Sequence, residues 1–442
     1  MVNATELPVE IISAIFYFVE APRLPGTSAA SSRTRLGQYV GICKAWQPVI
    51  EERVFEFIRL NSARVKEAST ILCRRCRFIR QIQLTVQLHG SRAEDVFVQY
   101  NNAVVHLFAI FADNATTRHK IPLPPLKFRI SCSELSIGEQ QIYLGDIGHG
   151  HPPMRIMPSS FEDIPTIQQL DELHIESTSM LAYTVLAAMC RISSRLPNLR
   201  VWSFVVPDGA TPPLSHLKIR LELGLDQLPT SLESFQFCYR IPPDQLDTEQ
   251  HQSLSKSLYQ LAMRPAMRLF HINGPFETSL IGDWPGLPGA FSEMTEFVVS
   301  MNAETPSGVQ LLLPETHDFV PQGRDTRTIQ YNQRTETLYT GSDFSIVNEA
   351  VMNPILVRAA AMASKMPRLQ RFSIQLLSRY TFKVAYKHGH LAVHNHHLYI
   401  PPPDVLRAWH SATTANLGQH EALSVMITSS GHRLPDFKIG ET

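Results

Sequence analysis

Histidines gather near the carboxyl end of this sequence, where they could bind a metal ion. Imidazole is the commonest metal ligand in proteins, but zinc sites also need a complete set of ligands at suitable spacing. These histidines alternate with Leu391, Val393 and Leu398, and no carboxylate or cysteine completes a site. The pattern predicts the solvent face of a hairpin that binds no metal. The histidines are His388, His390, His394, His396 and His397.

Two further motifs could bind a metal ion or a phosphate. Cys73 and Cys76 form a Cys-x-x-Cys pair within a basic stretch, but no second pair lies at ligand spacing, which favours a solvated basic face over a zinc site. The glycine-rich run 145–150 lacks the Lys-Ser/Thr ending and the strand-to-helix setting of a phosphate-binding loop. We expect no cofactor at either motif.

The sequence offers no familiar catalytic motif. It contains no Gly-x-Ser-x-Gly elbow, no His-Glu-x-x-His and no kinase or nucleotide motif. We therefore expect that this chain is not an enzyme. A hydrolase or metal enzyme hidden in the carboxyl-terminal region remains as an alternative, which stoichiometric bound metal would favour.

Composition narrows the classes of partner and compartment. Lys plus Arg and Asp plus Glu number 40 each, so no net charge steers the protein to nucleic acid or an anionic membrane. No apolar run is long enough to span a membrane, and residues 1–6 lack the basic start of a signal peptide. The six cysteines are scattered in mostly apolar surroundings and are interpreted as reduced core residues. We expect a cytoplasmic or nuclear protein of two or three domains.

The first sixty residues predict three short helices with more apolar surface than they can bury. Pro8 suits a first helical position, and the helix after it carries two apolar stripes. One stripe is Ile11, Ile15 and Phe18, and the other is Ile12, Phe16 and Val19. A helix that is apolar nearly all round must be buried on two sides, which favours a partner protein on one of them.

Two further helices are predicted before residue 60. Apolar residues at helical spacing run from Leu36 to Trp46, and Pro48 can end that helix and open the next. A third apolar face then consists of Val49, Val54, Phe55, Phe57, Ile58 and Leu60. Such a compact apolar unit is typical of a docking module.

These residues resemble the F-box. The resemblance consists of Leu-Pro-x-Glu-Ile at 7–11, the apolar helix after it, Val-Gly-Ile-Cys-Lys-x-Trp at 40–46 and an apolar stretch ending at Leu60. F-box proteins use this module to bind the Skp1 adaptor of a cullin–RING ubiquitin ligase. The resemblance implies Skp1 contacts at Leu7, Pro8, Ile11, Ile12, Ile15, Phe16, Val40, Cys43 and Trp46.

One segment departs from the F-box pattern. Residues 21–35, rich in Pro, Gly, Ser and Arg, separate the first two predicted helices where most F-boxes have a short turn. Fungal F-box proteins often carry such an insert. The alternative is that the three helices only cap a repeat array, since terminal repeats need caps.

An apolar triplet, with its members at positions i, i+3 and i+5, recurs from Ile79 onward. Since 44% of the residues are apolar, the triplet alone would recur by chance. From Leu170 onward its first residues are separated irregularly, from 27 positions between Met267 and Met294 to 75 between Met294 and Leu369, where insertions are expected. The triplets begin at Ile79, Leu170, Leu199, Leu232, Met267, Met294 and Leu369.

A proline shortly before four of these triplets raises the pattern above chance. Pro197, Pro229, Pro265 and Pro367 lie two or three residues before the first apolar position. Amphipathic helices are predicted before three of them, at 181–192, 254–261 and 356–366. Helix, proline turn and short strand in repetition are typical of a leucine-rich-repeat-like solenoid, although a general α/β sheet remains possible. A solenoid requires the strands to be parallel in one sheet.

The last sixty residues predict a hairpin and a helix. Phe382, Val384 and Tyr386 alternate as in a half-buried strand, and residues 387–390 can turn into a second strand running toward Ile400. After Pro401–Pro403, Asp404 could cap a helix that carries Val405, Leu406 and Trp409. Together with the triplet at Leu369, this region resembles the uncharacterised carboxyl-terminal region of fungal F-box proteins.

We therefore predict an α+β to α/β chain in three parts: a three-helix F-box at 1–60, an irregular leucine-rich-repeat-like α/β body at 61–380, and a hairpin with helix at 381–442. The resemblance implies a substrate-receptor subunit of an SCF-type E3 ubiquitin ligase that binds Skp1, through it cullin, and an unknown target protein. No nucleic acid, membrane, metal or cofactor is expected. The alternative is a repeat-based protein-binding scaffold with no ubiquitin-ligase role.

Overall fold

The computed structural model describes residues 47–88, 102–112, 124–134, 165–177, 189–190, 192–205, 224–238, 248–282, 291–314, 344–377, 382–395, 399–418, 421–429, 432–433 and 437–439. The chain divides into two compact units. Unit 1 comprises Met1–Tyr143, Ser160–Ile175 and Arg195–Leu199, and unit 2 comprises Leu144–Ser159, Glu176–Ser194 and Arg200–Thr442. Among the described helices, none is both long and apolar enough to cross a lipid bilayer.

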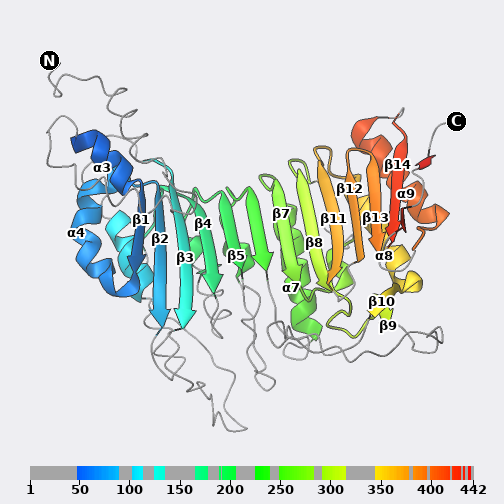
Figure 1. Ribbon diagram of the computed structural model, residues 1–442, viewed down its shortest axis with the longest axis horizontal. Coiled ribbons are helices and arrows are strands. Elements are labelled where there is room, and N and C mark those ends of the chain that lie inside the picture. The colour runs from blue at the N-terminus through cyan, green and yellow to red at the C-terminus, as the bar shows by residue number, and fades with distance from the viewer. Residues whose placement is uncertain are drawn as a thin grey trace, which may run out of the picture. The chain divides into compact units, whose positions relative to one another are not determined.

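Unit 1 contains short helices and parallel strands (Figure 1). In chain order its labelled elements are α3 (Gln47–Phe55), β1 (Phe57–Asn61), α4 (Val65–Arg75), β2 (Gln81–Leu88), β3 (Leu126–Glu134) and most of β4 (Leu170–Ser177). β1 pairs in parallel with β2, and β2 in parallel with β3. The helix at 102–112 packs Phe108 and Phe111 against Phe128 of β3, with ring centroids 5.4 and 5.5 Å apart. These aromatic contacts form part of the core of unit 1.

The expected third helix is shorter than the sequence predicts. The helix α3 ends at Phe55, and Phe57, Ile58 and Leu60 lie in the strand β1. The prediction of one helical apolar face through Leu60 is therefore wrong. The physical reason is the backbone pairing, since β1 satisfies its peptide groups against β2, and the carbonyl of Glu56 accepts hydrogen bonds from the N–H groups of Arg80 and Gln81.

Unit 2 is built on a mostly parallel sheet. Its parallel strands pair in chain order: β5 (Val201–Val205), β6 (Ser234–Cys238), β7 (Leu269–Gly274), β8 (Glu296–Asn302) and β11 (Arg371–Leu377). The sheet continues through β12 (Phe382–Lys387), β13 (His390–Asn395) and β14 (Leu423–Ser429), and β15 (His432–Arg433) and β16 (Phe437–Ile439) pair with β14. The pairing of β11 with β12 and of β12 with β13 is antiparallel, whereas β13 and β14 are parallel.

The predicted strands and helices of unit 2 are confirmed where the structure describes them. The strands that begin near Leu199, Leu232, Met267, Met294 and Leu369 are parallel neighbours in one sheet. The helices α7 (Thr248–Ala262) and α8 (Glu349–Ala363) precede the triplets at Met267 and Leu369. Most of the predicted helix at 181–192 lies outside the described residues. The strand at Leu170 is β4, most of which belongs to unit 1.

Every predicted triplet is buried. All members of the seven triplets have at most 5% of their surface exposed. The first residue of a triplet also closes a turn: the N–H groups of Leu199, Met267 and Leu369 donate to the carbonyl three residues earlier, at 3.1, 3.0 and 3.0 Å. The triplet is thus a turn followed by the inward-facing positions of a strand, which explains its spacing of three and then two.

An aromatic row crosses the core of unit 2. The register places Trp202, Phe235, Phe270, Phe297 and Phe372 side by side on successive strands. Neighbouring rings stack with centroids 5.0 to 5.6 Å apart and interplanar angles of 4° to 19°. Aromatic pairs in such geometry contribute about 0.5–1.5 kcal/mol beyond their burial. The row therefore joins the parallel strands into one continuous core.

The helices of unit 2 contact the buried face of the sheet. The indole N–H of Trp202 donates to the Ser193 hydroxyl at 3.1 Å. At the other end of the row Trp409, on the helix α9 (Pro403–Leu417), contacts Phe372 and Tyr386 at centroid distances of 5.6 and 5.2 Å. Side chains on the opposite face of these strands are therefore directed away from the helices, and we call that side the open face.

The helix α9 begins two residues before the position that the sequence suggests. Its N-cap is Pro402, and Pro403 occupies the first turn. The expectation that Asp404 caps the helix is wrong, because Asp404 lies inside the first turn. Proline is favoured at the first helical position, where its fixed φ suits the helix and no N–H is lost. Val405 and Trp409 are buried, as predicted.

Arg264 links the segment before β7 to the turn before β6 in unit 2. Its guanidinium donates to the carbonyls of Leu228 and Pro229 at 2.6 and 3.1 Å, and to those of Leu225 and Asp226 at 3.2 and 3.1 Å. Burial lowers the pKa of Arg264, and the nearby Asp226 carboxylate partly offsets this effect. The guanidinium therefore satisfies four carbonyls of the turn that precedes β6.

We expect the Arg264→Ala variant to lose about 2–3 kcal/mol of unfolding free energy, because it leaves several partly buried carbonyls without a donor. Arg268→Ala is the control. The Arg268 side chain is 54% exposed, and its contact with Glu233 is a long one of 3.9 Å. Its loss should therefore cost less than about 1 kcal/mol of unfolding free energy. Urea unfolding followed by circular dichroism measures both. Equal losses in the two variants would contradict the role given to Arg264.

Candidate binding surface

The residues that the F-box resemblance implies for Skp1 binding lie outside the described residues. They are Leu7, Pro8, Ile11, Ile12, Ile15, Phe16, Val40, Cys43 and Trp46. The described chain begins at Gln47, directly after Trp46.

The first described helix is tied to the basic stretch that follows it. Glu51 of α3, only 6% exposed, accepts from the guanidinium of Arg75 at 2.6 Å and from the amide of Gln47 at 3.0 Å. Ile50 is fully buried beside it. A buried carboxylate of this kind needs its partners, because an unpaired charge in the interior is strongly destabilising. This ion pair holds α3 against α4.

Cys73 and Cys76 of the Cys-x-x-Cys motif lie at the end of α4 and just after it. Cys76 is buried, and burial raises the pKa of its thiol. Both cysteines are free thiols. Within the described ranges, no three His, Cys, Asp or Glu side chains are grouped as metal ligands would be.

The histidine-rich hairpin is present where the sequence predicts it. β12 and β13 pair antiparallel through a two-residue turn, in which His388 and Gly389 have φ values of +46° and +78°. Positive φ at both central residues is typical of the type I′ turn, whose twist matches that of the strands. A side chain at Gly389 would also crowd Leu417, 3.2 Å from the added carbon. Gly389 is thus required by both conformation and space.

The predicted solvent exposure of the histidines is confirmed for the three that are described. His388, His390 and His394 are exposed, whereas Leu391 and Val393 are buried. A ring nitrogen of His394 lies 2.9 Å from the hydroxyl of Thr428 on β14. His396 and His397 lie outside the described residues, as does the glycine-rich run 145–150.

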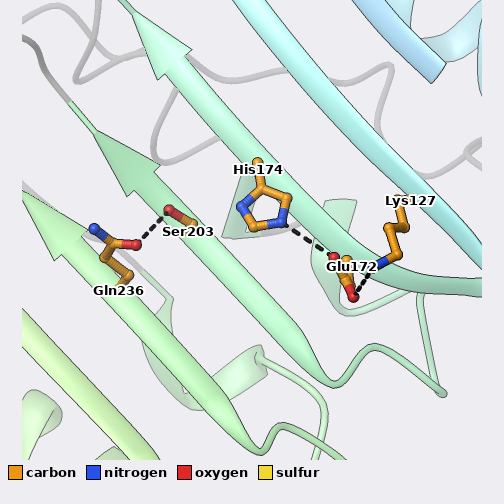
Figure 2. A network of polar contacts seen from close by, with 5 residues as sticks. All are labelled: Lys127, Glu172, His174, Ser203 and Gln236. Carbon is orange, nitrogen blue, oxygen red and sulfur yellow. Dashed lines mark hydrogen bonds and ion pairs between the residues drawn. The ribbon is translucent and has the colours of Figure 1, made fainter. Parts of the chain in front are cut away.

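Polar side chains line strands in both units (Figure 2). In unit 1, the Lys127 ammonium lies 2.6 Å from one oxygen of Glu172, and the His174 ring lies 3.4 Å from the other. In unit 2, the hydroxyl of Ser203 donates to the side-chain carbonyl of Gln236 at 3.3 Å. Exposed ion pairs of this kind contribute little to stability, about 0–1 kcal/mol.

The open face of unit 2 has a charge-balanced part on β6–β8. Glu233 lies 4.0 Å from Arg200 and 3.9 Å from Arg268. Glu296 lies 3.1 Å from the ring of His271 and 3.9 Å from Arg371 of β11. The acids and bases on these strands thus neutralise one another.

A row of small and polar side chains crosses the centre of the open face. In register, the residues from β5 to β14 are Ser203, Gln236, His271, Val298, Ser373, Ala385, Ala392 and Met426. The apolar triplets do not identify these residues, because they occupy the alternate, outward positions of each strand. For the five residues on β5–β8 and β11, the signal that could have found them is the position between the second and third triplet residues; Ala385, Ala392 and Met426 lie on strands without a triplet.

No protein-family model matches the sequence, and no curated protein matches it significantly. The geometry therefore carries the functional reasoning. It provides a sheet face that carries polar and charged side chains.

Proposed function

We propose that this chain is a substrate-receptor (F-box) subunit of an SCF-type cullin–RING E3 ubiquitin ligase. Residues 1–60 would bind Skp1 and through it cullin, in the cytoplasm or nucleus. The remainder, an irregular leucine-rich-repeat-like body, would bind the target protein. Ubiquitin transfer belongs to other subunits, so the chain itself is not an enzyme.

The observation that carries the proposal is the order of residue types at the amino terminus. Leu7-Pro8 precedes the first predicted apolar helix, and Val40, Cys43 and Trp46 follow at the spacing of a second predicted helix. A unit of about sixty residues cannot bury all of this apolar surface by itself, and each large side chain left in water forgoes about 1.5–3 kcal/mol. A partner with a complementary apolar surface accounts for the excess.

The body supports the proposal through its architecture. Among the described residues the helices of unit 2 pack on one face of the parallel strands, and repeat proteins commonly bind partners on an exposed face of such an array. This feature is also compatible with the second candidate function, a repeat-based scaffold with no ubiquitin-ligase role. Only the binding of Skp1 distinguishes the two.

Co-expression of the full chain with Skp1 tests the proposal. We expect the chain alone to be poorly soluble, since large exposed apolar patches favour aggregation, and to be rescued as a complex by Skp1. Size-exclusion chromatography measures the outcome. A chain that is soluble alone and elutes apart from Skp1 would support the scaffold instead.

A further inference from the structure

The open face of β11–β14 differs in charge from the rest of the sheet. The described residues of these four strands include Arg371, Lys383, Lys387, His390 and His394 on the open face, and no Asp or Glu. Arg371 has a distant partner, Glu296 of β8, at 3.9 Å. Within the described residues, no carboxylate lies within salt-bridge distance of Lys383 or Lys387.

These cations flank a floor of small side chains. Ser373, Ala385 and Ala392 are register neighbours on β11, β12 and β13. Ser373 is buried and the two alanines are half-buried. On one side of this floor, the strand register places Lys387 opposite His390 and beside Arg371. On the other side, it places Lys383 opposite His394. We call this arrangement the basic groove.

The dimensions of the basic groove suit an extended peptide. The two cationic rows are four residues apart along each strand, which corresponds to about 13 Å. The three strands that carry the cations, at a spacing of about 4.8 Å, extend over about 10 Å, the length of about three extended residues. A peptide chain lying across the strands would therefore contact cations on both sides.

The aromatic side chains of these strands argue against single-stranded nucleic acid. Phe372, Phe382 and Tyr386 are buried on the face that carries the helices. Proteins that bind single strands combine a cationic groove with exposed aromatic rings on which the bases stack. On the described part of β11–β14 the open face carries the imidazole rings of His390 and His394, but no Phe, Tyr or Trp.

We propose that the basic groove binds an extended, acidic peptide segment of a partner protein. Carboxylates of the peptide would pair with Lys383 and Lys387, while its backbone lies over the half-buried Ala385 and Ala392. The identification of that partner as a ubiquitin-ligase target rests on the proposed function. The binding itself does not, so it is measured without reference to ubiquitin.

The test uses the full chain, alone or with Skp1, and a fluorescein-labelled peptide of alternating glutamate and serine. We expect the wild-type chain to bind this peptide and not a peptide of alternating glutamine and serine. The double variant Lys383→Glu, Lys387→Glu should bind the acidic peptide about tenfold more weakly or worse, because two attractions become repulsions. Fluorescence anisotropy reports the Kd, and circular dichroism verifies that the variant is folded.

The matched control carries the same change in net charge elsewhere in unit 2. Lys256 of α7 and Arg407 of α9 are exposed on helices. The variant Lys256→Glu, Arg407→Glu should keep the Kd within about twofold of the wild type, since its charges lie away from the groove. The proposal fails if the two double variants weaken binding equally, if the acidic and neutral peptides bind alike, or if oligouridylate binds more tightly than the acidic peptide. Loss of Skp1 binding with peptide binding retained would overturn only the ubiquitin-ligase assignment.

Discussion

Replacing Phe270 by alanine is expected to lower the unfolding free energy of unit 2 by about 3–5 kcal/mol. The side chain is fully buried, and its ring stacks between Phe235 at 5.6 Å and Phe297 at 5.3 Å. Its removal leaves a cavity in the middle of the aromatic row, where parallel strands on both sides limit the collapse of the core. Urea unfolding monitored by circular dichroism measures the loss.

The neighbouring residue provides the control. His271 follows Phe270 on β7, but its side chain is 36% exposed on the open face and pairs with Glu296. His271→Ala should cost no more than about 1 kcal/mol. A loss at Phe270 that is no larger than the loss at His271 would show that the aromatic row is not the core of this unit.

The second large effect concerns Skp1. We expect the double variant Leu7→Ala, Pro8→Ala to bind Skp1 tens-fold more weakly than the wild type, at about 1.4 kcal/mol per tenfold. The variant removes one large apolar side chain and the proline that favours the start of the first helix. Titration of labelled Skp1 measures the Kd. The circular dichroism of the body should not change, because its core is built from other residues.

The sequence contains a matched control for this variant. A second Leu-Pro dipeptide, Leu24-Pro25, lies in the insert that interrupts the F-box pattern. Leu24→Ala, Pro25→Ala makes the same chemical change outside the predicted contact helices. It should leave Skp1 binding within about twofold of the wild type. If both variants weaken binding alike, the loss reflects general damage to the amino-terminal region.

The inward half of the fold could be predicted from the sequence. Burial requires apolar side chains at alternate strand positions, so the triplets at Trp202, Phe235 and Phe270 are visible as a pattern. The hairpin turn at His388 and Gly389 was predictable for a similar reason, because few residues accept the conformation it needs.

Three features could not be predicted from that pattern. The strand β1 resembles the continuation of an apolar helix, because its residues Phe57, Ile58 and Leu60 do not alternate with polar ones as a half-buried strand would. The interval of 75 residues between Met294 and Leu369 contains, besides the predicted helix, the small β9–β10 pair, Leu312–Pro314 with Phe344–Val347, which the pattern does not predict. Insertions of this kind obey no period.

The basic groove was the least predictable feature. Arg371, Lys383 and His390 lie on three different strands. Only the register of β11, β12 and β13 brings them onto one surface. Single-sequence patterns show which residues of one strand point outward, but not which strands become neighbours. A surface assembled from several strands therefore requires the structure.

Purification of the tagged chain from its source organism, with the proteasome blocked, tests the central claim most directly. The account predicts that Skp1 and a cullin co-purify with the wild type and with the double variant Leu24→Ala, Pro25→Ala. Both should be depleted with the double variant Leu7→Ala, Pro8→Ala. A target protein should accumulate in the fraction bound to the wild type. Bound proteins without Skp1, or Skp1 recovered equally with all three chains, would contradict the assignment of residues 1–60 as an F-box.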